Sequence, residues 1–408
     1  MKIALFVHNF PPEFLGGTEH VVLALAKSYE ALGAQVVVVA GSEQRVAGGA
    51  LTEESFEGVR VLRIQRDENE LYGLELGFAT TGDRITDLLA DEAPDAVHVH
   101  HWATLGWDLL QRAAALGIPG IATLHDLWTT CPRFFRRPPK NVRCPIDAGR
   151  EPCAPCVGQD LPDVPVAELT QSLVGRDRML QRELGSACAL VVPSRAQAEL
   201  VREHLPWAGS LEVVPHGLLA PVRSRARSHG VDVPLRVGSF GNIVPEKGIG
   251  LLVEALSNCG EQLELRLAGA VPDPSFLARI ERRAAELDIP FVWTGPYGPG
   301  DPHPALELDL AIFPSLCQES YGLVVDEALA HGVPVVVSAK GALPERAARG
   351  GVVVRSGGVL PLKVTLAGLL RSRRKLKQLR DEIPTEFPTI LDAARRYTAL
   401  LQKPEIAR

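Results

Sequence analysis

The sequence lacks any run of 18 or more apolar residues, so no segment predicts a transmembrane helix. It also lacks a recognisable signal peptide, because the opening MKIALFVHNFPPEF is short and soon interrupted by prolines. No excess of basic residues is present, and the formal net charge of −6 argues against nucleic acid as the main partner. These absences predict a cytoplasmic protein whose membrane contact is at most peripheral, at the inner face of the membrane.

Cysteine is scarce, and internal repeats and low-complexity segments are absent. The seven cysteines are an odd number and unevenly spread, which fits a reducing compartment better than a disulfide framework. At 408 residues the chain exceeds what a single hydrophobic core usually organises. Two domains are therefore expected.

Short apolar runs alternate with helical patterns along the whole chain. KIALFVH, AQVVVVAG, DAVHVHH and GIATLHD occur in the first half, and LRVGSFGN, LELRLAG, DLAIFPS and PVVVS in the second. Such alternation predicts βαβ units, and continuous apolar strands indicate parallel sheets that are buried on both faces. The fold class expected is α/β, with two doubly wound, Rossmann-like parallel-sheet domains that face an interdomain cleft.

A polar and basic passage, PVRSRARSHGVDVP, separates the two series of strands and predicts a linker over 219–233. The first domain then covers 1–218, with a cysteine-rich insertion at about 131–160. The second domain covers 234–384, and a C-terminal helix and tail occupy 385–408. We expect this last helix to return to the first domain.

Two carboxylates bracket the stretch LDLAIFPSLCQESYGLVVDEALAHGVPVVVS, which predicts a strand, a loop, a helix and another strand. Glu319 follows the first strand, and Glu327 lies eight residues later in a helix expected to begin near Tyr321. At a rise of roughly 1.5 Å per residue they are at most about 12 Å apart. That reach suits a sugar nucleotide, with Gly322 letting backbone N–H groups approach its phosphates. The alternative is an ordinary helix start with two solvated glutamates.

Several motifs occur in a fixed order: PPEFLGGTEHVVLALAKSYEALGAQVVVV, HVHHW, TLHDLW, VVPSRAQAE, VVPHGL, GNIVPEKGIGLLVEAL, and the Glu-x7-Glu block followed by HGVPVVVSAKGALPE. Over nearly its whole length the chain resembles the GT-B glycosyltransferases of the large retaining group called glycosyltransferase family 4. The resemblance implies transfer of a sugar from a nucleotide-diphosphate sugar, with retention of anomeric configuration and without a catalytic metal. The implied acceptor is a sugar, a lipid-linked glycan or a small molecule.

The resemblance also implies roles for individual residues. Gly16 and Gly17 are similar to the glycine loop that approaches the donor phosphates. His125 resembles the histidine beside the transferred sugar, and Lys247 the lysine that neutralises the donor diphosphate. The implied catalytic residues are His125, Lys247 and Glu319. The implied donor-binding residues are Gly16, Gly17, Asn242, Lys247, Glu319, Ser320, Tyr321, Gly322, Leu323 and Glu327.

One position departs from the family pattern. Relatives commonly have an arginine in a Gly-Arg-x-x-x-x-Lys arrangement, whereas this chain has Asn242 between Gly241 and the segment that ends at Lys247. Asparagine donates a hydrogen bond but brings no charge. Two alternatives to a transferase therefore stay open: a nucleotide-sugar-binding relative with impaired catalysis, and a nucleotide-sugar epimerase with the same fold.

Four cysteines fall in the insertion with the spacing C-x12-C-x8-C-x2-C: Cys131, Cys144, Cys153 and Cys156. Four thiols that end in a Cys-x2-Cys pair match the count for a structural zinc site, and many family relatives carry a similar cluster. An iron–sulfur cluster, a pair of disulfides and thiols without a ligand are the alternatives.

Basic and histidine-rich stretches have both functional and ordinary interpretations. The insertion contains RFFRRPPKNVR over 133–143, which fits an anionic acceptor, a membrane surface or a solvated flap. RSRRKLKQLR over 371–380 has the spacing of a solvated helix face. His98, His100 and His101 follow the end of a buried strand, where satisfied core histidines are expected rather than metal ligands.

Overall fold

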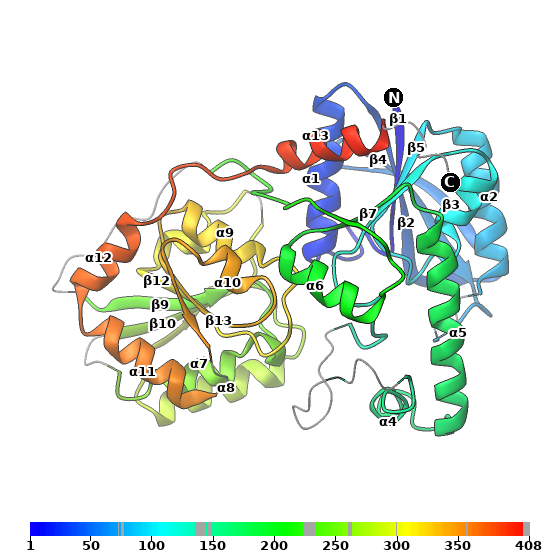
Figure 1. The fold of residues 1–408 in the computed structure, drawn as a ribbon. Coiled ribbons are helices and arrows are strands. Elements are labelled where there is room, and N and C mark those ends of the chain that lie inside the picture. The colour runs from blue at the N-terminus through cyan, green and yellow to red at the C-terminus, as the bar shows by residue number, and fades with distance from the viewer. Residues whose placement is uncertain are drawn as a thin grey trace. The chain divides into compact units, whose positions relative to one another are not determined.

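The computed structural model describes residues 1–71, 73–74, 77–134, 144, 149–222, 233–259, 263–298, 300–355 and 358–402. The chain divides into two compact units (Figure 1). Unit 1 comprises Met1–Ala220 together with Pro388–Arg408, and unit 2 comprises Pro221–Phe387. Each unit is built on its own sheet, which confirms the predicted α/β class with two parallel-sheet domains.

Unit 1 contains an eight-stranded sheet with the order β3-β4-β2-β1-β5-β6-β7-β8. The strands are β1 Lys2–Val7, β2 Gln35–Val46, β3 Ala50–Phe56, β4 Val59–Asp67, β5 Ala96–Val99, β6 Gly120–Thr123, β7 Ala189–Val192 and β8 Leu211–Val213. Only the edge pair β3–β4 is antiparallel among these pairings. Central strands such as β1 and β5 are buried because parallel strands are covered on both faces.

The helices of unit 1 are α1 Gly17–Ala31, α2 Ala79–Glu92, α3 Leu109–Ala115, α4 Ala154–Val157, α5 Val166–Gly185, α6 Arg195–His204 and α13 Ile390–Leu401. The last of these returns to unit 1 as predicted. Thr389 forms a β-bridge with Leu218, and the Thr389 side chain caps α13 by accepting from the Asp392 amide. Helix α13 packs against α1, and its Tyr397 is fully buried.

Unit 2 contains a six-stranded, wholly parallel sheet with the order β11-β10-β9-β12-β13-β14. Its strands are β9 Leu235–Phe240, β10 Leu263–Ala268, β11 Phe291–Trp293, β12 Leu310–Phe313, β13 Val335–Ser338 and β14 Gly351–Val354. Its helices are α7 Ile249–Leu256, α8 Pro274–Glu286, α9 Leu323–Ala330, α10 Leu343–Arg346, α11 Val359–Leu370 and α12 Arg373–Asp381, with short 3-10 turns η2 Pro245–Lys247 and η3 Pro304–Glu307.

The strand order reverses once in each sheet. In unit 2, β9 lies between β10 and β12, which is the order of a Rossmann domain. In unit 1, β1 lies between β2 and β5 in the same way. Loops that leave the carboxyl ends of strands at such a reversal diverge to opposite faces, and ligands bind in the crevice between them. The fold therefore points to the ends of β1 and β5, and of β9 and β12.

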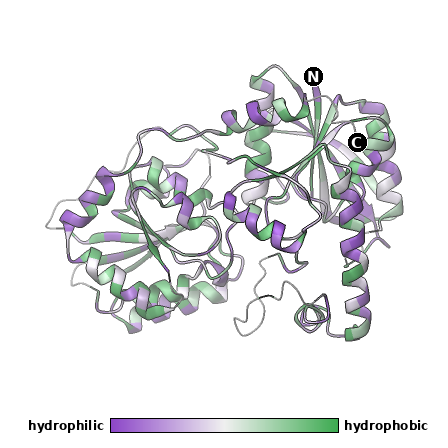
Figure 2. Cartoon of the chain, in the orientation of Figure 1, coloured by the Kyte–Doolittle hydropathy of each residue, from purple (hydrophilic) through white to green (hydrophobic). Residues whose placement is uncertain are grey.

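No helix among the described residues has the length and apolar character needed to cross a membrane. The basic insertion of the sequence lies largely outside the described part, since only Arg133 and Phe134 of 133–143 are placed. Arg133 forms an ion pair with Asp160 at 2.6 Å. Figure 2 shows hydrophobic residues along the central strands of both units, where the two cores lie.

The close approach of β9 and β10 predicts a strong effect of adding one methyl group to Gly238. A Cβ at this position would lie 1.8 Å from the carbonyl oxygen of Arg266, its register partner on β10. We expect Gly238→Ala to lower the free energy of unfolding of unit 2 by about 2 kcal/mol or more, because the clash is with backbone. Urea unfolding followed by circular dichroism measures the loss.

Gly250→Ala is the matched control. This glycine lies in α7, and the nearest atom to a Cβ there is 3.9 Å away. We expect this variant to be neutral or up to about 1 kcal/mol more stable, because alanine favours helix. Equal stability of the two variants would contradict the assigned strand pairing.

Candidate functional site

In unit 2, Lys247 and Glu319 meet at the reversal of strand order. Lys247 ends the turn η2 that follows β9, and Glu319 lies in the loop that follows β12. The Nζ atom of Lys247 lies 2.8 Å and 2.9 Å from the two carboxylate oxygens of Glu319. Ser315 donates its hydroxyl to the same carboxylate at 2.6 Å. The structure thus brings together two residues that lie 72 positions apart and that the sequence identified separately.

The loop that carries Glu319 is held by the segment between β13 and α10. The carbonyl of Glu319 accepts from the amide of Ala342 at 2.8 Å, and the side chain of Gln318 accepts from the amide of Gly341 at 2.7 Å. Gly341 has φ +52, and a Cβ there would lie 2.0 Å from the Glu319 carbonyl oxygen. A glycine is therefore required for these two loops to approach, and this contact fixes the position of the carboxylate.

Lys247 carries a positive charge that remains accessible. Burial lowers the pKa of this ammonium, but the charge of Glu319, the hydrogen bond to it and the nearby Cys317 and Glu246 together outweigh that effect, so the pKa is raised above its usual value. The side chain of Lys247 is 39% exposed, against 15% for Glu319. A cation paired with one carboxylate and open to solvent can receive an anionic ligand.

The helix α9 begins at this same edge of the sheet. Gly322 is its N-terminal cap, with φ +88, which confirms a glycine-dependent helix start close to the predicted position. Glu327 lies in α9 with 26% of its side chain exposed, and His303 Nε2 lies 3.6 Å from its carboxylate. His303 in turn stacks on His331 with ring centroids 4.2 Å apart. Glu327 is thus a partly exposed carboxylate with an imidazole beside it.

The remaining residues that the sequence predicts to bind the donor have different surroundings from one another. Tyr321 is buried, and its hydroxyl donates to Asp326 at 2.7 Å and accepts from Arg346 at 3.1 Å. Its side chain therefore supports α9 from within. Leu323 is the first residue of α9, and Ser320 directly precedes Tyr321 in the loop. Asn242 is exposed, two residues after the end of β9.

Unit 1 places six histidines at the ends of neighbouring strands. They are His8 after β1, His98 in β5, His100 and His101 after β5, His125 after β6, and His216 after β8. Five of them are more than nine-tenths buried: His98, His100, His101, His125 and His216. Burial, followed by the mutual repulsion of the imidazoles, lowers the pKa of His98, His100 and His125 well below its usual value. These three rings are therefore neutral at physiological pH.

Four of these histidines, His98, His100, His125 and His216, form a continuous series of contacts. His100 Nδ1 lies 2.7 Å from His125 Nε2, and the His98 and His100 rings have centroids 4.0 Å apart. His125 stacks on His216 at 5.0 Å. The sequence identified only His125 as functional. Parallel pairing of β1, β5 and β6 brings the other rings to the same edge, and HVHH was the available signal.

Two carboxylates complete this edge of unit 1. Glu19 in α1 accepts from the Gly16 amide at 2.9 Å, and its other oxygen lies 3.5 Å from His8 Nε2. Asp126 lies 3.5 Å from His101 Nε2, and the His8 and His101 rings are 4.0 Å apart. Carboxylate, imidazole, imidazole and carboxylate thus follow one another. Sequence reasoning missed Glu19.

Gly16 and Gly17 differ in their surroundings. Gly16 is buried as the cap of α1, and a Cβ there would lie 2.8 Å from Glu19 Oε2. Gly17 is exposed, and a Cβ there would meet nothing within 4 Å. Gly16 is thus packed against Glu19. Because nothing lies close to Gly17, a ligand can approach the start of the helix there.

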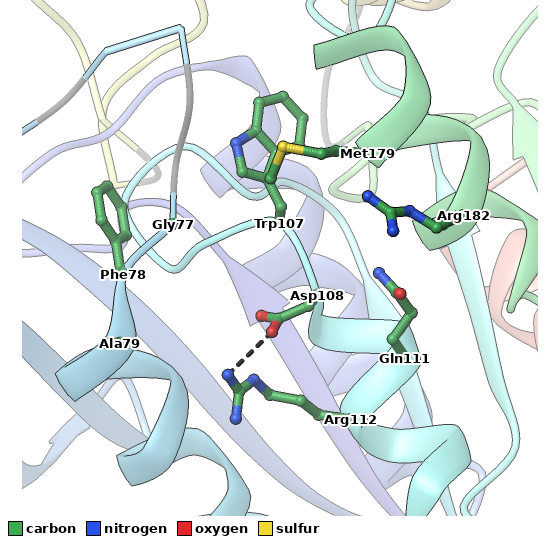
Figure 3. Close-up of a pocket in the computed structure, with 9 residues that line it drawn as sticks. All are labelled: Gly77, Phe78, Ala79, Trp107, Asp108, Gln111, Arg112, Met179 and Arg182. Carbon is green, nitrogen blue, oxygen red and sulfur yellow. Dashed lines mark ion pairs between the residues drawn. The ribbon is translucent and has the colours of Figure 1, made fainter. Parts of the chain in front are cut away.

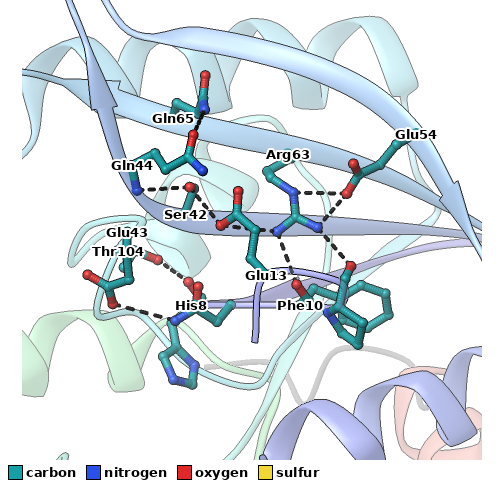
Figure 4. Close-up of polar contacts among 12 residues, drawn as sticks. His8, Phe10, Glu13, Ser42, Glu43, Gln44, Glu54, Arg63, Gln65 and Thr104 are labelled. Carbon is teal, nitrogen blue, oxygen red and sulfur yellow. Dashed lines mark hydrogen bonds and ion pairs between the residues drawn. The ribbon is translucent and has the colours of Figure 1, made fainter. Parts of the chain in front are cut away.

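A buried arginine holds the loop between β1 and α1 (Figure 4). Arg63 in β4 is 3% exposed and donates to the carbonyls of Phe10 and Pro11 at 3.2 Å and 2.8 Å, and to the Glu54 carboxylate. Glu13 joins the network by accepting from Ser42 at 2.8 Å. No local pattern in the sequence predicts this network, because Arg63 lies more than 50 positions along the chain from the loop carbonyls that it contacts.

In the part of the chain that the structure describes, no disulfide joins the four insertion cysteines. Among the described residues, no group of three or more His, Cys, Asp or Glu side chains is arranged to hold a metal ion. Arg133 instead donates to the Cys156 sulfur at 3.3 Å, and a guanidinium nitrogen of Arg150 lies 4.0 Å from the Cys153 sulfur. The two sulfurs of the Cys-x2-Cys pair thus each lie beside an arginine.

A cavity of about 400 Å³ lies in unit 1, away from the predicted site residues (Figure 3). It is lined by Gly77, Phe78, Ala79, Trp107, Asp108, Gln111, Arg112, Met179 and Arg182. The guanidinium of Arg112 is engaged by Asp108 at 2.9 Å. In unit 2 a smaller hollow of about 100 Å³ has Ser315 and Lys340 in its wall. It therefore adjoins the Glu319 loop through Ser315.

Comparison with known proteins gives two family matches that together span most of the chain. The profile of Glycosyltransferase Family 4 matches residues 15–218, and that of Glycosyl transferases group 1 matches residues 234–371.

Sequence relatives and solved structures agree with these matches. D-inositol 3-phosphate glycosyltransferase of Xylanimonas cellulosilytica is 26% identical over 365 residues, which cover 80% of this chain and 76% of that enzyme. Lipopolysaccharide 1,2-N-acetylglucosaminetransferase of Salmonella typhimurium is 27% identical over 176 residues, 38% of this chain and 45% of that enzyme. The structure of Anabaena Alr3699/HepE in complex with UDP and glucose matches with a TM-score of 0.65 at 17% identity, covering 98% of this chain and 99% of that one. This last likeness shows that the two proteins share a fold.

The buried carboxylate of Glu19 predicts a dependence of stability on pH. Burial raises the pKa of Glu19 from 4.5 to about 7. Between these values the folded state keeps a proton that the unfolded state has lost. The free energy of unfolding therefore falls as pH rises through this window, by on the order of 3 kcal/mol from this group. We expect Glu19→Gln, which cannot ionise, to remove that part of the decline.

Urea unfolding at several pH values from about 4.5 to 7.5 measures this slope. Tryptophan fluorescence is suitable because four of the five tryptophans belong to unit 1. Glu30→Gln, an exposed position on the same helix, is the control and should keep the parent slope. An unchanged slope in Glu19→Gln would show that this carboxyl titrates normally.

Proposed function

The chain belongs to Glycosyltransferase Family 4, and on that premise we propose that it transfers a sugar from a nucleoside-diphosphate sugar to an acceptor hydroxyl with retention of anomeric configuration. The observation that carries the proposal is the pairing of Lys247 with Glu319 at the strand reversal of unit 2. That pair offers a cation for a diphosphate and a carboxylate for sugar hydroxyls. The UDP and glucose bound by the structural relative HepE support this class of donor.

Each half of the donor has a matching group in unit 2. Lys247 would neutralise the diphosphate and stabilise the charge that grows on the leaving group. Glu319 would accept from hydroxyls of the transferred sugar, and Glu327, partly exposed on α9, would accept from the ribose. The amides at the start of α9 would donate to phosphate oxygens, since a helix N-terminus favours an anion.

The bond changes proposed are those of a front-face displacement. The bond between the anomeric carbon and the phosphate oxygen breaks, and a bond to the acceptor oxygen forms on the same face of the sugar. The acceptor proton passes to the leaving phosphate, so no protein base is needed. His125 of unit 1 would donate to a hydroxyl of the transferred sugar, and Asn242 would donate to the diphosphate without adding charge.

We propose that unit 1 binds the acceptor, and that this acceptor is a polyhydroxylated compound such as a sugar or a glycan. His8, Glu19, His101 and Asp126 form a run of hydrogen-bonding groups beside the Gly16–Gly17 loop. Imidazole and carboxyl side chains suit hydroxyls, which both donate and accept. The relatives named for inositol phosphate and for lipopolysaccharide also act on acceptors of this kind.

Asn242 favours one alternative, a nucleotide-sugar-binding protein without turnover. An arginine there would add a charge-assisted contact to phosphate, and asparagine does not. Incubation of the protein with a panel of nucleoside-diphosphate sugars separates the two proposals. Thermal stabilisation by one donor together with release of nucleoside diphosphate supports the transferase. Stabilisation without release supports the binding protein.

Lys247→Ala tests the donor site directly. We expect kcat for release of nucleoside diphosphate to fall about 10²- to 10³-fold, because one preorganised group that stabilises the leaving phosphate is lost. Arg279→Ala, which removes an exposed cation from α8 of the same unit, should leave the rate unchanged. An unchanged rate in Lys247→Ala would remove the lysine from the mechanism. Proton NMR of the product at early times reports whether the anomeric configuration is retained.

We also propose that unit 2 contacts anionic membrane surfaces through α11 and α12. The segment 371–380 holds six cations and no acidic residue, in a chain whose net charge is −6. Figure 2 shows α12 as mostly hydrophilic. On the adjoining α11, Leu360 is 71% exposed and Val364 is 65% exposed, one helical turn apart. Exposed aliphatic side chains beside a basic helix fit an anionic lipid surface.

Co-sedimentation with vesicles tests this contact. We expect binding to vesicles that contain anionic phospholipid, weakened by salt, and no binding to purely zwitterionic vesicles. Leu360→Asp should reduce binding more than about tenfold, because an apolar side chain is no longer buried in lipid. Val166→Asp, at an exposed position of α5 in unit 1, is the matched control. Equal binding of these two variants would overturn the assignment of this surface.

A further inference from the structure

We propose that His100 is a positioning residue for the transfer reaction: it holds the His125 ring in one orientation and one tautomer, with the proton of His125 on Nδ1. The inference rests on the proposed function, in which His125 donates to the transferred sugar. It concerns a residue that does not itself touch the substrate. The geometry of the contact between the two rings carries it.

The contact is short and excluded from water. His100 Nδ1 and His125 Nε2 are 2.7 Å apart, and the two residues are 1% and 7% exposed. Two bare nitrogen lone pairs do not approach to this distance, so one of the two nitrogens carries a proton and donates it. Because burial lowers the pKa of both rings, each is neutral and holds a single proton. Only two arrangements are then available.

The surroundings of His100 distinguish the two arrangements. His100 Nε2 is buried and has no hydrogen-bond partner. If His125 donated, His100 would have to carry its proton on Nε2, which would bury an unpaired N–H at a cost of about 1–3 kcal/mol. If His100 donates from Nδ1, only a lone pair is left without a partner. We therefore assign the proton between the rings to His100, and His125 keeps its own proton on Nδ1.

The orientation of His100 is set from deeper in unit 1. Its ring lies on that of His98, with centroids 4.0 Å apart. Both ring nitrogens of His98 form hydrogen bonds, Nε2 with the Thr123 hydroxyl at 2.8 Å and Nδ1 with the Tyr29 hydroxyl at 3.2 Å. The ring of Tyr397, from the returning helix α13, packs on His98 at 4.7 Å. A continuous series of contacts thus runs from Tyr29 in α1 and Tyr397 in α13, through His98 and His100, to His125.

The consequence for catalysis is that His125 presents a hydrogen-bond donor, and not an acceptor, to the substrate. With Nε2 occupied by His100, the Nδ1–H group is the hydrogen-bond donor that His125 offers to a sugar hydroxyl. Without His100 the ring could rotate or exchange tautomers, and a fraction of the enzyme would present an acceptor instead. A wrong tautomer of a catalytic histidine greatly reduces rate even where the ring remains in place.

Two variants of His100 separate positioning from simple packing. His100→Phe keeps a ring in the core but has no donor, and we expect kcat to fall about 10- to 100-fold with little change in the KM for the donor, a range typical of losing an orienting partner. His100→Asn keeps an N–H at the position of Nδ1 and should restore most of the rate. His204→Phe, on the helix α6, makes the same substitution at another histidine and should leave kcat unchanged.

NMR gives a readout that does not depend on activity. Long-range ¹⁵N–¹H spectra of the intact protein, assigned by comparison with His125→Gln, report which ring nitrogen of His125 carries the proton. We expect Nδ1–H in the parent protein and in His100→Asn, and a mixture or a change to Nε2–H in His100→Phe. If His100→Phe does not fold, the parent and His100→Asn spectra still decide the question.

The possible results are distinct. An Nε2–H proton on His125 in the parent protein, or a parent-like rate in His100→Phe, would overturn the positioning role. Absence of turnover with every donor would instead overturn the proposed function, and the NMR spectra would still test the contact between the rings. Loss of rate in His100→Phe without rescue by His100→Asn would show that the ring matters only for packing.

Discussion

The carboxyl ends of β1 and β5, and of β9 and β12, are the places on which the site depends, because strand order reverses there. Crossovers on either side of a reversal leave toward opposite faces of the sheet, and a crevice opens where the loops diverge. Each reversal therefore leaves room for polar groups that a continuous sheet would bury. Lys247 and Glu319 occupy one reversal, and His8, His100 and His101 occupy the other.

The two reversals of strand order differ in the charge of the side chains that lie there. In unit 2 the groups are charged and paired, and Lys247 keeps its charge because Glu319 compensates for burial. In unit 1 burial lowers the pKa of His8, His98, His100 and His125 well below its usual value, so these rings are neutral, and burial raises the pKa of Glu19 to about 7. A paired cation suits a diphosphate, whereas neutral imidazoles, which both donate and accept, suit hydroxyls.

Much of the candidate site in unit 2 could be predicted from sequence, because its signals are local. The strand, loop and helix around Glu319 are contiguous, and Gly322 is the helix cap expected from its neighbours. Tyr321 shows the limit of this approach, since its place beside Asp326 and Arg346 depends on how α9 packs on α10. The cysteine spacing predicts zinc from the number of thiols, whereas the contacts of Cys156 with Arg133 and of Cys153 with Arg150 could not be predicted from it.

The order of apolar runs, glycines and motif residues was sufficient to determine two parallel-sheet domains and the returning C-terminal helix, and to name Lys247, Glu319 and His125 as candidates. These features depend on periodicity and on neighbours in the chain. Only the tertiary structure decided that His100 faces His125, that Arg63 holds the loop before α1 and that Tyr397 supports His98. Those contacts join residues between 25 and almost 300 positions apart, and strand register and helix packing, which no local pattern encodes, bring them together.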